Sequence, residues 1–235
     1  MNFTRDRAEF MRQMRAEYTA QGETIEIPDP PRPAQMRRLF RFLRGRPQEA
    51  IDAYTSYTTI FYIHRGHTPD PGDVQYPGGA GDTCDSWSEI MDTGMQDSMH
   101  VIDCEAYAYM GAVLLREAGF RFVRYINIVP RDWFGNNHVI AEMRTPGAAA
   151  QTIFVSNDWI YDSLRSAVES VGFDMQNVRY GYGQTVHEAD DEAYWIKVRW
   201  RLERAGDALQ SAGEAVERTD RRIRQSLGPL GPLLP

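Results

Sequence analysis

The chain has 235 residues, of which 42% are hydrophobic and 25% charged, a composition typical of a soluble globular protein with a core of its own. The formal net charge of −7 argues against a nucleic-acid partner, because phosphate binding requires a concentrated basic surface. No segment approaches the roughly 18 apolar residues that span a bilayer, and the charged N-terminus has no secretory signal pattern. We therefore expect a cytoplasmic protein as synthesised, without a membrane span; export by a signal-peptide-independent route stays open.

Helices are expected throughout the first 65 residues. Apolar residues recur at helical spacing from Phe3 to about Ala20, and a proline-rich connector follows. Pro33 suits the first turn of a second helix that Gly45 ends, and Pro47 opens a third. Residues 1–65 are thus predicted to form an N-terminal helical region packed on the core.

A long segment without periodicity follows, from His67 to Thr83, and it is rich in Gly, Pro and Asp. A loop of this length inside a compact domain is usually functional or mobile. A short helix is expected from Asp85. The clearest helix of the chain runs from Cys104 to Ala118, with Asp103 as its N-cap.

Three strands are predicted after this helix, because β-branched and aromatic residues alternate with polar ones. They cover Phe120 to Val129, Asn137 to Arg144, and Gln151 to Asp158, and their linkers resemble hairpin turns. A helix followed by antiparallel strands indicates the α+β class. Another helix is expected after Trp159, to about Val171.

The C-terminal region, residues 188–235, is predicted to hold a long charged helix from about Asp190 to Ser226 and a proline-rich tail. This helix is a candidate surface for self-association or partner binding. Residues 66–187 form the predicted catalytic core. Together with residues 1–65, the three regions are expected to form one globular unit.

Cys104 is the candidate nucleophile, because the first turn of a helix favours the negative charge of a thiolate. His138 begins the second predicted strand, and Asn157 and Asp158 end the third. If these strands pair as a hairpin, the three polar positions meet at one edge of the sheet. A histidine there can hold the thiol proton, and a third polar group can orient its ring.

These residues also carry a resemblance to a known family. The segments DCEAYAYMGAVLLREAGF, NHVIAEM and IFVSNDWIYD resemble the transglutaminase-like branch of the papain-like cysteine enzymes, over about residues 82–162. The resemblance implies a nucleophile helix packed on an antiparallel sheet. It implies Cys104 as nucleophile and His138 as base, with Asp158, or Asn157 as in papain-type enzymes, as the orienting group.

Other residues are assigned supporting roles. The Cys104 N–H and the Gln96 side chain are candidates for an oxyanion hole, and Trp87 and Trp133 for the walls of a substrate groove. Cys84 is a rival nucleophile, but it lacks the helix of small residues. Because no CxxC or HExxH pattern occurs, no metal and no cofactor are expected.

The sequence therefore predicts a cysteine-dependent acyl-transfer enzyme that acts on amide bonds of protein or peptide substrates. Water as acceptor gives a protease, amidase or deamidase, and an amine gives a transglutaminase; hydrolysis is favoured because no second pocket is evident. A bacterial effector or toxin is one form of this hypothesis. The alternative is a non-catalytic helical interaction module that retains the fold.

Overall fold

The computed structural model describes residues 3–64, 75–76, 79–84, 95–96, 99–130, 138–183 and 194–200. The backbone alone is described for residues 75–76, 79–84, 95–96, 129–130, 179, 181–183 and 194–200. The chain divides into two compact units, Met1–Arg199 and Trp200–Pro235. Residues 201–235, which include most of the predicted C-terminal helix, and the helix predicted from Asp85 lie outside the described ranges.

The first unit begins with the three helices predicted from the sequence, α1 (Arg7–Ala20), α2 (Pro33–Phe42) and α3 (Pro47–Phe61). Asp6 caps α1 by accepting a hydrogen bond from the Glu9 N–H at 2.8 Å. Proline opens α2 and α3, where its missing N–H costs no helical hydrogen bond. After α3 the chain continues directly as strand β1 (Tyr62–His64).

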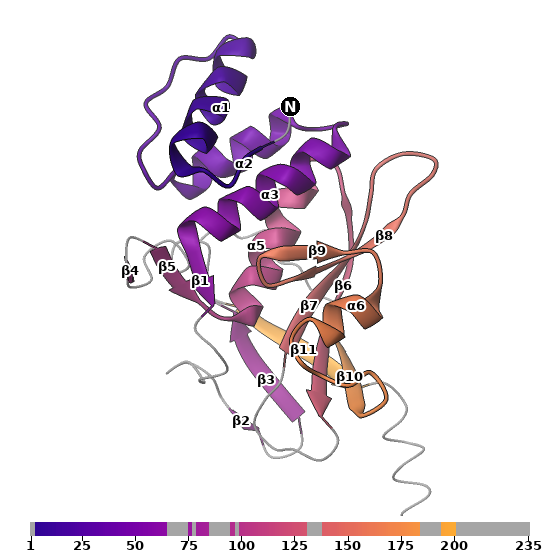
Figure 1. The fold of residues 1–235 in the computed structure, drawn as a ribbon. Helices are drawn as coiled ribbons and strands as arrows, with labels where there is room; N and C mark the ends of the chain where they lie inside the picture. The colour runs from indigo at the N-terminus through magenta and orange to yellow at the C-terminus, as the bar shows by residue number, and fades with distance from the viewer. Residues whose placement is uncertain are drawn as a thin grey trace, which may run out of the picture. The chain divides into compact units, whose positions relative to one another are not determined.

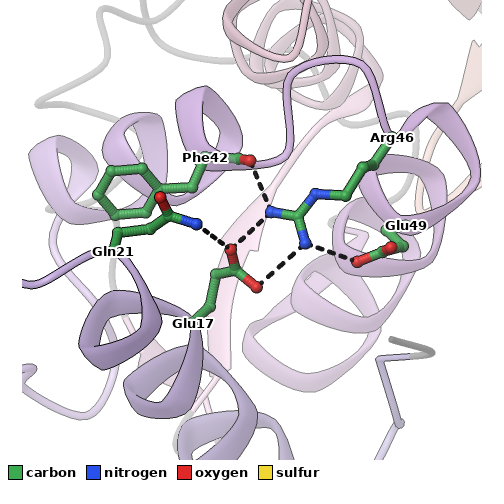
Figure 2. A network of polar contacts seen from close by, with 5 residues as sticks. All are labelled: Glu17, Gln21, Phe42, Arg46 and Glu49. Atoms are coloured by element: carbon green, nitrogen blue, oxygen red, sulfur yellow. Dashed lines mark hydrogen bonds and ion pairs between the residues drawn. The ribbon is translucent and has the colours of Figure 1, made fainter.

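A partly buried ionic cluster joins α1 to the start of α3 (Figure 2). The Arg46 guanidinium binds Glu17 through Nη2–Oε1 at 2.5 Å and Nη1–Oε2 at 3.2 Å, and it donates to the Phe42 carbonyl at 2.6 Å. Gln21 and Glu49 complete the cluster, at 3.0 Å from Glu17 and 3.1 Å from Arg46. Burial alone would raise the pKa of Glu17, but its bonds to Arg46 and Gln21 outweigh burial and lower that pKa.

Strands far apart in sequence form one large sheet with the order β2-β3-β11-β10-β6-β7-β8-β9. From β6 to β9 the strands form an antiparallel meander. Their bounds are β2 Gln75–Tyr76, β3 Gly79–Cys84, β6 Arg121–Pro130, β7 His138–Arg144, β8 Thr152–Ser156, β9 Trp159–Tyr161, β10 Val178–Gly183 and β11 Tyr194–Trp200. In a smaller sheet, β5 (Met99–Ile102) lies between β1 and β4 (Met95–Gln96).

Helix α5 (Cys104–Glu117) lies between the N-terminal helices and the large sheet (Figure 1). Its small residues allow a close approach: a Cβ atom on Gly111 would lie 2.6 Å from Val155 Cγ1 of β8. Tyr54 of α3 lies near the same glycine, and its hydroxyl donates a hydrogen bond to the Tyr107 carbonyl at 3.1 Å. Glu117 binds Arg37 and Arg41 of α2, at 2.7 Å each.

Alternation along β7 divides the core into two parts. Val139 belongs to the main cluster with α5, whereas Ile140 belongs to a second cluster with Ala167 and Val168 of α6 (Leu164–Glu169). Successive side chains of a strand point to opposite faces, so α5 and α6 cover opposite faces of the meander. Helices on an antiparallel sheet confirm the predicted α+β class at this level.

The helix expected after Trp159 is present as α6, but it starts only at Leu164, because Trp159 begins strand β9 after a two-residue turn that Asn157 enters at φ 52°. Two other sequence predictions are wrong where the structure describes them. The predicted long helix is a strand from Tyr194 to Trp200, because its apolar residues alternate with Lys and Arg and it pairs with β3. The segment His67–Thr83, predicted to lack structure, contains β2 and most of β3.

Candidate functional site

The candidate nucleophile lies where the sequence places it, at the first residue of α5. Asp103 is the N-cap, and its Oδ1 accepts a hydrogen bond from the Ala106 N–H at 2.9 Å. This local cap forms because an aspartate before a run of helix-forming residues satisfies a free N–H group. The Cys104 side chain is buried, with 4% of its surface exposed.

The surroundings of the thiol favour its protonated form. Cys104 Sγ donates a hydrogen bond to Glu105 Oε2 at 3.2 Å. Burial raises the pKa of the Cys104 thiol well above its usual value, and the Glu105 and Asp103 carboxylates raise it further. A hydrogen bond from the Val139 backbone lowers this pKa but does not offset the other effects. The resting side chain is therefore a thiol at neutral pH.

The same Val139 contact brings Cys104 to the start of β7, where His138 is the first residue. His138 is fully buried, and its Nε2 lies 2.9 Å from Ser156 Oγ. Ser156, the last residue of β8, is also buried. Sequence reasoning missed this serine, although alternation along the third predicted strand puts it two residues before Asp158.

The thiol and the imidazole approach the start of β7 from different faces. In the β6–β7 register His138 pairs with Ile128, which belongs to the α6 cluster, whereas Val139 belongs to the α5 cluster. Cross-strand partners share a face of the sheet. The structure therefore brings Cys104 and His138 to the same strand end, with the main chain at 138–139 between the two faces.

The predicted orienting groups, Asn157 and Asp158, form the turn between β8 and β9 and are held by α3. Tyr54 donates to the Asn157 carbonyl at 3.0 Å. Thr58 Oγ1 donates to the Asp158 carbonyl at 3.3 Å, and Thr59 Oγ1 lies 3.5 Å from Asp158 Oδ2. The Asp158 carboxylate is thus directed toward α3, and Ser156 is the side chain hydrogen-bonded to His138 Nε2.

The supporting residues are described less fully. Gln96 lies in β4, opposite Met99 of β5, with only its backbone placed. The predicted groove residues Trp87 and Trp133 lie outside the described ranges. The rival nucleophile Cys84 ends strand β3 and pairs with Tyr194 of β11.

The structure adds a buried asparagine that the sequence pattern did not single out. Asn127 of β6 is 1% exposed and pairs in register with Val139, the residue whose backbone meets the Cys104 thiol. Neither its Oδ1 nor its Nδ2 has a hydrogen-bond partner in the described part of the chain. One signal was present: Asn127 interrupts an apolar run, YINIV, at a position that alternation assigns to a buried face.

Within the described ranges, no group of three or more His, Cys, Asp or Glu side chains gathers as a metal site. No described helix is both long enough and apolar enough to cross a membrane. No family model, no curated protein and no solved structure matches this chain.

Proposed function

We propose that this protein is a cysteine-dependent acyl-transfer enzyme with a core of the papain-like, transglutaminase-like type. Its substrates are amide bonds of proteins or peptides. The observation that supports this most is the contact of the Cys104 thiol, at the N-terminus of α5, with the Val139 backbone beside His138.

Each residue has a role in the proposed chemistry. Cys104 Sγ attacks the amide carbonyl carbon while its proton passes to His138. The imidazolium then protonates the leaving amine, and the resulting thioester is released by water or by an acceptor amine. At rest the ring is hydrogen-bonded to Ser156, and we propose Asp158 or Asn157 as the group that orients it once it has turned toward the thiol.

The raised pKa of Cys104 affects how this reaction begins. A thiol that is protonated at rest does not form a stable thiolate–imidazolium pair, so proton transfer accompanies attack on the bound substrate. His138 starts on the α6-facing side of β7, so its ring must turn around the strand end to reach the thiol. We expect substrate binding to accompany this movement.

The alternative function is a non-catalytic interaction module. One observation favours it: the thiol is 4% exposed and hydrogen-bonded to a carboxylate that keeps it protonated. In that case Cys104 is a structural residue of the core, and His138 and Ser156 form a buried structural hydrogen bond.

Amide turnover by point variants separates the two functions. Ammonia release from a Gln-containing peptide and cleavage of casein are measured for the wild type, Cys104→Ser and His138→Ala. We expect both variants to lose at least about 10³-fold in kcat/KM, because the nucleophile and base act as a unit. Cys84→Ser is the matched control and keeps its activity. Equal turnover by Cys104→Ser and the wild type would contradict the proposal, and inactivity of all four proteins would favour the interaction module.

A further inference from the structure

The hydroxyl group of Tyr54 joins two parts of the candidate site. Tyr54 lies in α3, in the N-terminal helical region, and its side chain is fully buried. The hydroxyl donates to the Tyr107 carbonyl of α5 at 3.1 Å and to the Asn157 carbonyl of the β8–β9 turn at 3.0 Å. A hydroxyl has one proton to donate, so this proton is shared between the helix that begins with Cys104 and the turn that carries the predicted orienting groups.

The turn that Tyr54 contacts has an uncommon backbone conformation. Asn157 has φ 52° and is the only non-glycine residue with a positive φ in the described ranges. Such a conformation is unfavourable for a residue with a side chain, although asparagine tolerates it better than most. It persists only where the surroundings hold it, and residues of this kind concentrate at functional sites. The bond from Tyr54 to the Asn157 carbonyl is one of the contacts that hold it.

Close packing of α3 on α5 keeps the Tyr54 hydroxyl in place. A Cβ atom on Gly111 of α5 would lie 3.2 Å from this hydroxyl and 2.6 Å from Val155 Cγ1 of β8. Gly111 therefore permits both the tyrosine and the sheet to approach the helix that carries Cys104. Because interior packing of this density restricts movement, the hydroxyl can fix the distance between α5 and the turn.

The same turn holds a carboxylate near α5. Burial raises the pKa of the Tyr107 hydroxyl, and the Asp158 carboxylate raises it further. Tyr107 follows Cys104 by three residues, so the two side chains are neighbours on the helix surface. From α3, Thr58 Oγ1 donates to the Asp158 carbonyl at 3.3 Å, and Thr59 Oγ1 lies 3.5 Å from Asp158 Oδ2. The turn therefore keeps a carboxylate within electrostatic reach of a residue one helical turn from the thiol.

We propose that Tyr54 is a positioning residue of the acyl-transfer site. Through its two carbonyl partners, Tyr54 fixes the β8–β9 turn relative to α5 and so sets where the orienting group meets the imidazole. This inference rests on the function proposed above, in which Asp158 or Asn157 orients the His138 ring. Tyr54 acts through the turn and not on the substrate. The N-terminal helical region, which carries no predicted catalytic residue, thereby supports the reaction.

A second tyrosine of the same helix provides a matched control. Tyr57 of α3 is also fully buried, and its hydroxyl lies 3.0 Å from the hydroxyl of Tyr62 in β1. This bond joins α3 to the strand that directly follows it. Tyr54→Phe and Tyr57→Phe each remove one buried hydroxyl from α3, but the hydroxyl of Tyr54 is the one bonded to the β8–β9 turn.

Steady-state amide turnover, measured by the two assays above, tests this role. We expect Tyr54→Phe to lower kcat about 10- to 100-fold and to leave KM within about twofold, because a displaced orienting group impairs the reaction and not substrate binding. Tyr57→Phe should keep both constants within about twofold of the wild type. Both variants should lower Tm by a similar amount, roughly 2–4 °C, because each removes one buried hydrogen bond.

A double-mutant cycle separates positioning from a general loosening of the fold. Asp158→Ala and Asn157→Ala are made alone and together with Tyr54→Phe. In each background that itself loses turnover, Tyr54→Phe should lower the remaining kcat less than about twofold, because the group that it positions is absent. A full additional loss in that background, full turnover by both alanine variants, or equal kcat for Tyr54→Phe and Tyr57→Phe would overturn the assignment.

Backbone hydrogen exchange, read by mass spectrometry over residues 153–162, does not depend on turnover. Tyr54→Phe should speed exchange there about fivefold, as expected for the loss of one hydrogen bond, and Tyr57→Phe should not. If Cys104→Ser turns over as fast as the wild type, the proposed function fails and the catalytic role of the turn fails with it, while faster exchange still shows that Tyr54 holds the turn. If turnover requires Cys104 but Tyr54→Phe changes neither kcat nor exchange, the acyl-transfer function stands and the positioning role is overturned.

Discussion

Two polar regions of the same unit, one partly buried and one buried, are built in opposite ways. In the cluster between α1 and α3, both Glu17 oxygens are bonded and the Arg46 guanidinium has three partners (Figure 2). At the start of α5 and β7, the thiol is held against a carboxylate, and the Asn127 carboxamide has no described partner.

The difference separates a structural role from a functional one. Satisfied polar groups join elements and fix their geometry, as Glu17 and Arg46 do for the N-terminal helices. Unsatisfied groups lower the stability of the fold and remain able to bind a ligand. By this criterion the α1–α3 cluster stabilises the fold, whereas the end of α5 fits the functional role that we propose for it.

Breaking the satisfied cluster should give the largest change in stability. Glu17→Ala removes the carboxylate and leaves Arg46, which is one-third exposed, without its buried partner. We expect a loss of about 2–3 kcal/mol in the free energy of unfolding, measured by urea denaturation. Glu49→Ala, at the edge of the same cluster, should cost less than about 1 kcal/mol. A smaller loss for Glu17→Ala than for Glu49→Ala would contradict the comparison.

Removing the charge next to the thiol should make the site more reactive. Glu105→Gln lowers the pKa of Cys104, because it removes a carboxylate that raises this pKa. Each unit by which the pKa falls increases the thiolate fraction about tenfold. The thiolate also becomes about threefold less nucleophilic, so the net gain in rate is about threefold. We expect labelling by iodoacetamide at pH 8 to accelerate about threefold per unit.

Glu142→Gln is the matched control for this variant. Glu142 is also buried, but it pairs with Arg124 on β6 and is not among the groups that shift the pKa of Cys104. Its substitution should leave the labelling rate unchanged. Equal acceleration by both variants would show that a general loosening of the fold, and not the local charge, sets the labelling rate of Cys104.

The smallest expected effect is on the pH dependence of stability, through the salt bridges of Glu117 in α5 with Arg37 and Arg41 in α2. Burial would raise the pKa of Glu117, but its hydrogen bonds to Arg41 and Arg37 outweigh burial and lower it. A folded-state pKa below the unfolded value of about 4.3 gives stability that is present above that pH and lost as the pH falls. Glu117→Gln should therefore cost about 1 kcal/mol at pH 7.

This cost should shrink as the pH falls below the unfolded value and through the lowered folded-state pKa of Glu117, because the wild-type carboxylate is then protonated as well. Urea unfolding of both proteins over a pH series measures the difference. Glu169→Gln breaks an exposed ion pair with Arg165 and serves as the control. Its effect on the free energy of unfolding should hardly change with pH. A constant difference between pH 7 and pH 3 would show that the loss is not electrostatic.

Local signals in the sequence predicted much of the fold. Asp103 and the small residues after Cys104 predicted α5 with its cap, and the alternation of apolar and polar residues predicted β6, β7 and β8. The predictions failed where pairing overrides local preference. Residues 194–200 have a composition that suits a helix, yet they pair with β3 as a strand.

By itself, the sequence determined which elements carry Cys104 and His138, because caps and periodicity act between residues close in the chain. Only the tertiary structure decided what surrounds these two residues. Ser156 binds the imidazole because β8 pairs with β7, and the thiol stays protonated because α5 is buried beside its own carboxylates. Asn127 meets the same strand end through the β6–β7 register. Burial and cross-strand contact depend on residues far apart in the chain, so a local pattern can mark a buried position but cannot identify its partner.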